Sequence, residues 1–393
     1  MIDAAEALSL IPPPAPGGSR IAVAMSGGVD SSLTAALYAA RGFEVIGITM
    51  QLYDHGAAVG RARSCCAGRD IHDARAVADA LGIPHYVTDY EQSFAGKVMQ
   101  QFAASYRAGE TPIPCVLCNQ HIKFVDLLGQ CRDLGAEAMV TGHYVQLRQG
   151  PDGPQLYQGA EPNRDQSYFL FTLTRDQMDY LRFPLGGYTK DETRHLAAQM
   201  GVPVAAKPDS QDICFVPDGD YKAVVDRLAH EKEQPGEIRH LDGRVLGRHQ
   251  GISGFTIGQR RGLGVAVGEP LFVLRIDAGE RAVIVGDREH LRVSEIRLRQ
   301  VNWLGEVMSG TAEPIDVHVK YRSTQAPVPA RLIRDGSEAV VELAEDQYGI
   351  SPGQACVFYD GAAEARLLGG GWISSLTHTS PIAAGAGHDS QKI

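Results

Sequence analysis

The sequence predicts an α/β protein: a parallel-sheet domain, followed by a small central domain and a small β-barrel, for which a sandwich is the alternative. Two observations predict this class. Up to about residue 216, short β-branched segments alternate with longer amphipathic ones, which is typical of parallel βαβ units that bind ligands at the carboxyl ends of their strands. From about residue 218, short apolar segments separated by glycines take over, as in small β-rich domains.

The expected elements of the first domain come as strand and helix in turn. Glycines end several of the expected helices, at Gly42, Gly82, Gly109 and Gly135, where a left-handed residue is the usual stop signal. In order, the segments are "RIAVAMS", "SSLTAALYAARG", "FEVIGITM", "DIHDARAVADALG", "PHYVTDY", "FAGKVMQQFAASYRAG", "NQHIKFVDLLGQCRDLG" and "AEAMVTGHY".

The remaining segments lack long amphipathic stretches. The central part contains "HLDGRVLG", "HQGISGFTIGQRRGLGVAVG" and "PLFVLRIDAGERAVIVG", and the last part contains "IDVHVKYRS", "PVPARLIRDGSEAVVEL" and "ACVFYDG". The predicted divisions are a disordered leader (1–19), the α/β domain (20–217), the central domain (218–290), the barrel (291–376) and a disordered tail (377–393).

Composition narrows the class of protein. A formal net charge of -10 over 393 residues argues against indiscriminate binding to nucleic acid or to an anionic membrane, so any nucleic-acid partner needs a local basic patch. No apolar run is long enough to span a bilayer, and the acidic, proline-rich leader is unlike a signal peptide. Seven cysteines, an odd number without an export signal, favour reduced thiols. We therefore expect a cytoplasmic protein.

The turn "AMSGGVDSS" at 24–32 is the first candidate site. It lies between an expected strand, Ile21–Met25, and a helix that begins near Ser31, so free backbone N–H groups and the positive end of the helix dipole meet there. Gly27 and Gly28 allow an anion to approach the backbone closely. The alternative is an ordinary turn in which Asp30 or Ser31 caps the helix.

Two other nucleotide-binding patterns are missing from this turn. No lysine follows the glycines, as a Walker loop requires, and the G-x-G-x-x-G spacing of dinucleotide folds does not occur there. A loop without that lysine suits a pyrophosphate held as a unit. Attack then falls on the α-phosphate and gives an adenylated substrate.

S-G-G-x-D-S after a first strand resembles the PP-loop of the ATP pyrophosphatases, a group that includes GMP, NAD and asparagine synthetases and tRNA thiolation enzymes. The resemblance implies an adenine nucleotide alpha hydrolase-like fold, ATP with Mg²⁺ as cofactors, and Asp30 as a metal ligand. The implied ATP-binding residues are Ala24, Met25, Ser26, Gly27, Gly28, Val29, Asp30, Ser31, Met50 beside the adenine, and Gly142.

Two cysteine segments select among these enzymes. "TPIPCVLCNQHIKF" at 111–124 and "PDSQDICFVP" at 208–217, together with "VTGHY", "RDQSYFL" and "TIGQRRGLG", resemble the bacterial tRNA-specific 2-thiouridylases in order and spacing, from Ile21 to about Ile373. The resemblance implies that ATP adenylates O2 of the wobble uridine and that sulfur from a persulfide on Cys118 displaces AMP. Cys214 then attacks the inner sulfur or closes a disulfide. A cysteine desulfurase or a relay protein supplies the sulfur, and neither DNA nor a membrane is a partner.

Cys118 fits a nucleophile because it is expected at the start of a helix, where the dipole lowers the pKa of a thiol. Cys115 departs from the family pattern, which has an aspartate there that contacts the target base. Cys115, Cys118 and Cys214 could instead hold an iron–sulfur cluster, or C-x-x-C could be a redox pair. Zinc is less favoured because no second pair of zinc ligands follows in the sequence.

The other four cysteines are not expected to take part in the reaction. Cys65 and Cys66 are expected to be exposed, whereas Cys131 and Cys356 are expected to pack in the protein interior.

The resemblance also implies a surface for tRNA, which explains two extra β-rich domains better than a small molecule does. Arginine pairs suit phosphate contacts, and Tyr321 could stack on a base. The implied tRNA-binding residues are Ile113, Pro114, His143, Arg164, Asp165, Gln166, Arg260, Arg261, Tyr321, Arg322 and Gln354.

Two other functions stay open. A PP-loop amidoligase would form AMP with ammonia and without tRNA, and loss of Cys118 would matter little. A non-catalytic tRNA-binding or chaperone protein would bind tRNA without releasing AMP. The paired cysteine segments argue against the first and the PP-loop against the second.

Overall fold

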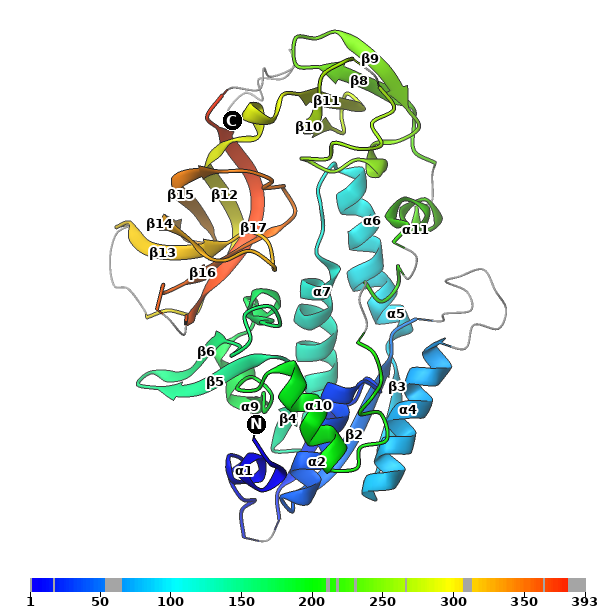
Figure 1. Cartoon of the computed structure of the whole chain (residues 1–393), viewed down its shortest axis with the longest axis vertical. Coiled ribbons are helices and arrows are strands. Elements are labelled where there is room, and N and C mark those ends of the chain that lie inside the picture. Colours follow the sequence, from blue (N-terminus) through cyan, green and yellow to red (C-terminus); the bar gives the residue numbers. More distant parts are fainter. Residues whose placement is uncertain are drawn as a thin grey trace.

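The computed structural model describes residues 2–16, 18–53, 66–209, 213–216, 219–229, 232–265, 267–306, 313–362 and 365–380. An α/β domain, a small central sheet and a closed barrel follow one another along the chain (Figure 1). The predicted fold class is therefore confirmed, and the last domain is a barrel rather than a sandwich.

The α/β domain is built on a five-stranded parallel sheet with strand order β3-β2-β1-β4-β7. Ile21 and Val23 of β1 belong to the hydrophobic core on one face of the sheet, and Ala22 belongs to the core on the other. This alternation is the two-residue period of a strand buried on both faces. The strands are β1 (Arg20–Ala24), β2 (Glu44–Gln51), β3 (His85–Asp89), β4 (Ala138–Val140) and β7 (Leu181–Arg182).

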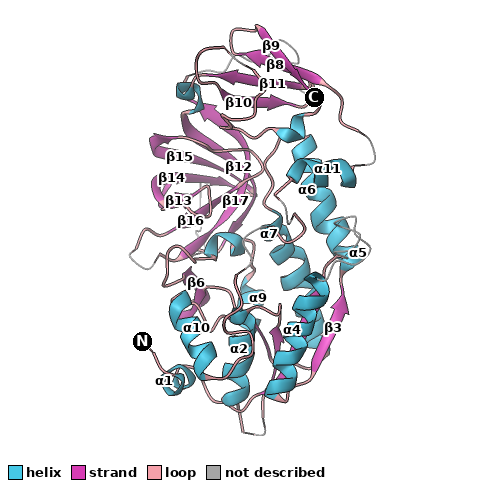
Figure 2. Ribbon diagram, turned by 45° about the vertical axis from the view of Figure 1, so that its right-hand side comes forward, coloured by secondary structure: helices cyan, strands magenta, loops and turns pink. Residues whose placement is uncertain are grey.

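One face of the sheet is covered by helices that Figure 2 shows side by side. They are α2 (Val29–Ala40), α4 (Cys66–Leu81) and α10 (Lys190–Gln199). Within the same core, α2 packs on β1 and β2, α4 packs on β2 and β3, and α10 packs on α2. This layer brings α10, which lies far along the chain, beside the turn that follows β1.

The predicted disordered leader is partly wrong. Helix α1 (Ala4–Ser9) is capped by Asp3, whose side chain accepts a hydrogen bond of 2.8 Å from the backbone N–H of Glu6. Ala7 and Ile11 are buried in the same core as α2. The cap at Asp3 and the packing of two apolar residues, Ala7 and Ile11, against the core therefore order this segment.

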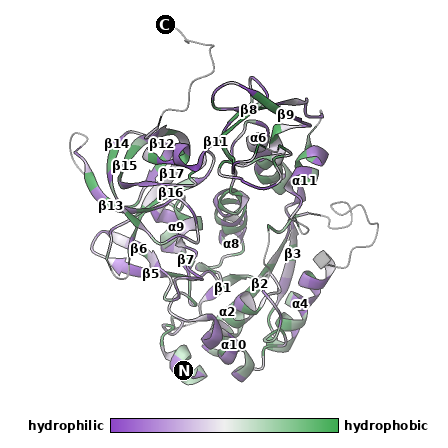
Figure 3. Cartoon of the chain, turned by 45° about the horizontal axis from the view of Figure 1, so that its top comes forward, coloured by the Kyte–Doolittle hydropathy of each residue, from purple (hydrophilic) through white to green (hydrophobic). Residues whose placement is uncertain are grey.

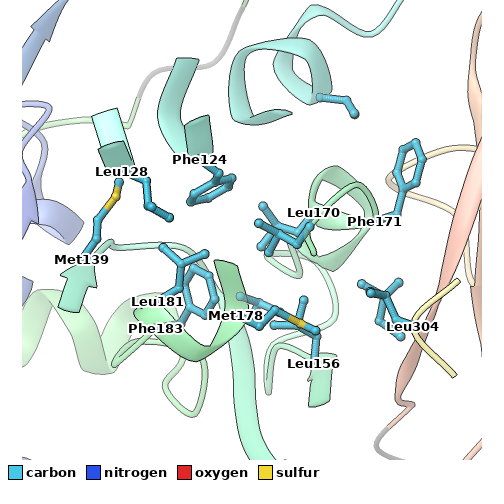
Figure 4. Packing of buried hydrophobic residues seen from close by; sticks show 14 of the residues in the cluster. Phe124, Leu128, Met139, Leu156, Leu170, Phe171, Met178, Leu181, Phe183 and Leu304 are labelled. Atoms are coloured by element: carbon cyan, nitrogen blue, oxygen red, sulfur yellow. The ribbon is translucent and has the colours of Figure 1, made fainter. Parts of the chain in front are cut away.

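The other face carries one continuous helical stretch from Pro114 to Asp133 and a layer of short elements. Phe124 and Leu128 of this stretch belong to the hydrophobic core that Figure 4 shows, together with Met139 of β4 and Leu170. The hairpin β5–β6 lies outside the main sheet, and β5 is largely hydrophilic in Figure 3. The elements are α5 (Glu91–Phe94), a π-helical turn (Ala95–Met99), α6 (Gln100–Arg107), α7 (Pro114–Leu117), a π-helical segment (Cys118–Leu127), α8 (Leu128–Asp133), β5 (Val145–Gly150), β6 (Gly153–Gln158), a 3₁₀ turn (Ser167–Leu170) and α9 (Arg175–Tyr180).

The central domain is a four-stranded sheet of order β10-β11-β8-β9 with its own apolar core. Its elements are α11 (Tyr221–Leu228), β8 (Gly236–His240), β9 (Val245–His249), a 3₁₀ turn (Ile252–Gly254), β10 (Phe272–Asp277), β11 (Ala282–Gly286) and a 3₁₀ turn (Arg288–Leu291). Helix α11 packs against α6 of the α/β domain.

Six antiparallel strands close the barrel in the order β12-β15-β14-β13-β16-β17, with β17 paired back to β12. Leu304, Val357 and Trp372 from this part join the core beneath Leu170 and Phe171, so the barrel is packed onto the α/β domain. The strands are β12 (Val293–Trp303), β13 (Ile315–Lys320), β14 (Val328–Asp335), β15 (Glu338–Gln347), β16 (Ala355–Tyr359) and β17 (Leu367–His378).

The predicted disordered tail begins inside β17, which continues to His378, and residues 381–393 lie outside the described part of the chain. None of the described helices is both long enough and apolar enough to cross a membrane.

Candidate functional site

The predicted phosphate turn lies between β1 and α2. Gly28 is the N-cap of α2 and no side chain caps the helix, so the first backbone N–H groups remain available to an anion. The turn is held from within, because the backbone N–H of Ser26 donates to Oγ of Ser31 at 3.1 Å and Oγ of Ser31 lies 3.2 Å from the carbonyl oxygen of Gly28. Sequence and structure agree on this strand, turn and helix.

Gly27 is required by the turn. Its φ is +73°, and a Cβ atom there would lie 2.2 Å from the carbonyl oxygen of Asp70 in α4. We expect Gly27→Ala to destabilise the protein by about 2 kcal/mol or more, because the alanine would be strained in the left-handed backbone conformation and its Cβ atom would clash with Asp70. Gly28→Ala is the matched control, since φ there is -89° and the nearest contact would be 3.5 Å, and we expect a change within about 0.5 kcal/mol. Urea denaturation of both variants measures this, and equal losses would contradict it.

The turn has two lysines beside it that the local sequence did not indicate. Lys190, the first residue of α10, is buried, and its Nζ lies 2.7 Å from Oδ1 of Asp30 and 2.9 Å from Oδ1 of Asp209. Nζ of Lys207 donates to the carbonyl oxygen of Gly27 at 3.0 Å. Both cations thus lie where phosphate charge is expected, although neither follows the glycines in sequence.

Asp209 is the centre of an ion-pair network. It contacts Lys190, Arg194 at 2.8 Å and Arg164 at 3.1 Å. Burial by itself would raise the pKa of Asp209, but these three cations hold it below the ordinary value. The carboxylate is therefore charged at neutral pH and fixes the start of the segment that leads to Cys214.

Asp30 lies at the surface of the turn, where the resemblance places a metal ligand. Its carboxylate accepts hydrogen bonds from Lys190 and from the hydroxyl of Tyr144 at 2.8 Å. Gly142 packs against it, because a Cβ atom at Gly142 would be 2.9 Å from the carbonyl carbon of Asp30. Met50 is half-buried near the end of β2, at the same edge of the sheet.

Cys118 does not begin a helix, which corrects the sequence expectation. The helix starts at Pro114, so Cys118 lies one turn inside it and Cys115 lies in the first turn. Proline is favoured at the first helical position, where its missing N–H costs nothing. Cys118 is only 9% exposed, and burial raises the pKa of its thiol.

The two cysteine segments meet in one cluster. Cys118 packs in a core that contains Phe215 and Val216, and Ile213 packs against that core. Burial raises the pKa of Cys214 to about 12, and the nearby thiols of Cys118 and Cys115 add to the rise, so the three sulfur atoms lie within reach of one another's charge. Cys115 and Cys214 are exposed, and all three thiols are free.

These thiols do not form a metal site in this arrangement. Among the described residues, no group of three or more His, Cys, Asp or Glu side chains is placed to hold a metal ion. Cys131 and Cys356 are buried free thiols of the cores, as expected for packing residues. Cys65 lies outside the described residues, and Cys66 is the first residue of α4.

Two residues expected to contact tRNA are instead buried. The side chain of Asp165 is 1% exposed and accepts from Nζ of Lys320 at 3.3 Å and from the backbone N–H groups of Gly159 and Ser167. Tyr321 is 4% exposed and donates to Gln347 at 2.8 Å, so it packs in the barrel core rather than presenting a ring for stacking. Their contacts within the fold exclude both from direct contact with RNA in this conformation.

The other residues expected at the tRNA surface fall into two sets. Arg260 and Arg261 are exposed, Arg322 is exposed while its Nε donates to the carbonyl oxygen of Gly349 at 2.8 Å, and Arg164 is exposed while paired with Asp209. The remainder are tied to the protein: Ile113 and Pro114 are buried at the start of α7, Gln166 accepts from the backbone of Tyr144, and Gln354 donates to the carbonyl oxygen of Thr111.

His143 is half-buried between Phe124 and Phe183, with ring centroids 5.8 and 6.0 Å away. Burial, and then the charge of Lys123, lower its pKa well below the ordinary value. Its ring is therefore neutral at physiological pH and offers hydrogen bonds rather than positive charge.

Three family models match the chain. They are described as the tRNA methyl transferase HUP domain over residues 19–218, the tRNA methyl transferase PRC-barrel domain over 224–287, and the aminomethyltransferase beta-barrel domain over 293–373.

Similar proteins cover nearly the whole length. The tRNA-specific 2-thiouridylase MnmA of Parvibaculum lavamentivorans is 58% identical over 371 residues, 93% of this chain and 93% of that protein. The enzyme of the same name from Rhodospirillum centenum is 56% identical over 388 residues, 95% of this chain and 97% of that protein. A solved complex of a 4-thiouridine synthetase with RNA and ATP is 15% identical, with a TM-score of 0.32, over 55% of this chain and 54% of that one.

Proposed function

Because this chain belongs to the tRNA-specific 2-thiouridylase family, we propose that it replaces O2 of the wobble uridine in tRNA by sulfur, in an ATP-dependent reaction. The observation that carries this proposal is the meeting of two cysteine segments, 96 positions apart (214 − 118), in one cluster of the domain that bears the nucleotide turn. An enzyme that only attached ammonia or an amine would need neither cysteine.

In the first half of the reaction, O2 of the uridine attacks the α-phosphorus of ATP, and pyrophosphate leaves. The uncapped N–H groups of α2 and the cations Lys190 and Lys207 favour the negative charge of the phosphates at the turn. Positive charge that is already in place costs no reorganisation as the leaving group forms. The adenylated O2 is then a good leaving group.

In the second half, the terminal sulfur of a persulfide on Cys118 attacks C2 of the uridine and AMP leaves. The thiolate of Cys214 then attacks Sγ of Cys118, which releases 2-thiouridine and leaves a Cys118–Cys214 disulfide. A cellular dithiol must reduce that disulfide by two electrons before the next turnover. The contact between the segments of Cys118 and Cys214 supports this sequence of steps.

The implied cofactors fit the site unequally. Asp30 supplies carboxylate oxygens of the kind that Mg²⁺ prefers, and its neighbours Lys190 and Tyr144 already fix its position, so it is our proposed ligand for the metal that accompanies ATP. Among the described residues no group of three or more His, Cys, Asp or Glu side chains is placed to hold a metal ion, so we propose no iron–sulfur cluster at Cys115, Cys118 and Cys214.

The partners follow from the chemistry. The exposed arginines of the central domain and barrel, Arg260, Arg261 and Arg322, are proposed to contact tRNA phosphates. A cysteine desulfurase or a relay protein is the proposed source of the persulfide sulfur. Since tRNA is the substrate, we propose the cytoplasm as the place of action.

The test uses the full chain with unmodified tRNA, Mg-ATP, a cysteine desulfurase with cysteine, and a dithiol. We expect 2-thiouridine in the digested tRNA by mass spectrometry, together with one AMP for each sulfur inserted. AMP formed with ammonia in the absence of tRNA would indicate the amidoligase instead, and tRNA binding without AMP would indicate a binding protein. Absence of 2-thiouridine under both aerobic and anaerobic conditions would refute the proposal.

A further inference from the structure

The cysteine cluster contains a lysine that neither the motifs nor the reaction scheme assigns. Lys123 is half-buried in the π-helical segment that begins at Cys118. Burial raises the pKa of Cys115, Cys118 and Cys214, and the positive charge of Lys123 lies close enough to all three thiols to oppose that rise. Its position in the helix explains this proximity.

The π-helical segment brings Lys123 over Cys118. In a regular α-helix a residue five positions later is rotated by ~500°, which leaves its side chain about 140° away from the first. In the segment Cys118–Leu127 the backbone hydrogen bonds instead join residues five apart, so Lys123 follows Cys118 by about one wide turn. Such wide turns are rare in proteins, and those that occur are often found at functional sites.

The charge of Lys123 is not neutralised by an acid in the part of the chain that the structure describes. The neighbouring Lys97 differs, since its Nζ lies 2.8 Å from Oδ2 of Asp126. Lys97 and Asp126 also face His121, whose pKa is lowered by burial. Because Lys97 and Asp126 form an ion pair, they add little net charge near the cysteines. In the described part of the chain, Cys115 and Cys214 are the other titratable groups beside Cys118. His143, whose pKa is lowered by burial and then by Lys123, faces Lys123 from the segment after β4.

A buried sulfur anion needs such a partner. Burial of Cys118 disfavours its thiolate, while persulfide formation and transfer both require negative sulfur at that position. The corrected helix start removes the helix N-terminus as the source of positive potential at Cys118. Lys123 is then the group left to supply it.

We propose that Lys123 is a positioning residue of the cysteine site, whose ammonium group stabilises the negative sulfur on Cys118, first as thiolate and then as persulfide. The persulfide part rests on the proposed function. The thiolate part is a property of the protein without tRNA or ATP, so it can be tested separately.

The experiment measures alkylation of Cys118 by iodoacetamide from pH 6 to 10, read by peptide mass spectrometry on the full reduced chain. In Lys123→Met the pKa of Cys118 rises, so we expect the midpoint of the reaction profile to move up by about one pH unit and the rate at pH 7.5 to fall about tenfold. Lys123→Arg keeps the charge and should retain a profile close to that of the natural protein. Lys222→Met is the control, because Lys222 is exposed in α11 and paired with Asp226.

The outcomes are decisive in either direction. A raised midpoint in Lys123→Met alone, with unchanged near-ultraviolet circular dichroism, supports the proposal even if no tRNA is thiolated. An unchanged midpoint overturns it. A reaction that is slower by the same factor at every pH also overturns it, because that result would mean only that iodoacetamide reaches Cys118 less easily. Failure of Cys118 to react in the natural protein at any of these pH values would also overturn it.

Discussion

Replacing Cys118 by serine is expected to abolish 2-thiouridine formation, with a loss of at least about a thousandfold in rate. A serine hydroxyl has the same place in the helix but cannot carry a persulfide, and a hydroxyl at a position only 9% exposed is a poor nucleophile. The measurement is single-turnover thiolation of tRNA with enzyme in excess, followed by nucleoside mass spectrometry.

Cys131→Ala is the matched control. Cys131 lies on the same continuous helix, is 1% exposed and belongs to the core against the sheet. We expect this variant to lose stability but to thiolate tRNA within about threefold of the natural protein when assayed below its unfolding temperature. If Cys118→Ser kept a tenth of the activity, Cys118 would not be the sulfur carrier, and Cys115 or Cys214 would need to take that role.

The second large effect concerns the joint between the barrel and the α/β domain. Lys320 and Asp165 form an ion pair at 3.3 Å whose side chains are 3% and 1% exposed. Removing one partner of such a pair leaves an uncompensated buried charge, which costs about 3–5 kcal/mol. We expect Lys320→Met to lower the temperature of thermal unfolding by about 6 °C or more, as measured by calorimetry.

The exposed pair of Lys222 and Asp226 provides the comparison, since Lys222→Met should cost only about 0.3–0.5 kcal/mol. Adding Asp165→Asn to Lys320→Met removes the stranded charge and should restore part of the loss. Equal unfolding temperatures for Lys320→Met and the natural protein would contradict this prediction. The role of Asp165 as an anchor between domains would then have to be abandoned.

Much of the fold was predictable, because its signals are local. The alternation of β-branched and amphipathic segments predicted β1, α2 and β2, and glycines at positive φ end the helices at Gly42, Gly82, Gly109 and Gly135. The leader was mispredicted because the prediction rested on its proline-rich part at 12–16. The short capped helix before that part is stable through packing of Ala7 and Ile11, which the local sequence does not report.

The site was predictable to the same extent. The turn at 24–31 and the cysteine segments are proposed sites whose chemistry lies in a few adjacent residues, so motif and resemblance were enough to indicate them. The start of the helix before Cys118 was misplaced by four residues, although Pro114 signals it, since proline is favoured at a first helical position.

What the sequence by itself determined is the nucleotide turn, the order of the domains and the family, because each depends on short-range pattern. The tertiary structure alone decided which charges meet. It brought Lys190 across 160 positions to Asp30, buried Asp165 against Lys320, and withdrew Tyr321 from the surface. Ion pairs and burial arise from packing between distant segments, and a single sequence carries no periodicity that reports such contacts.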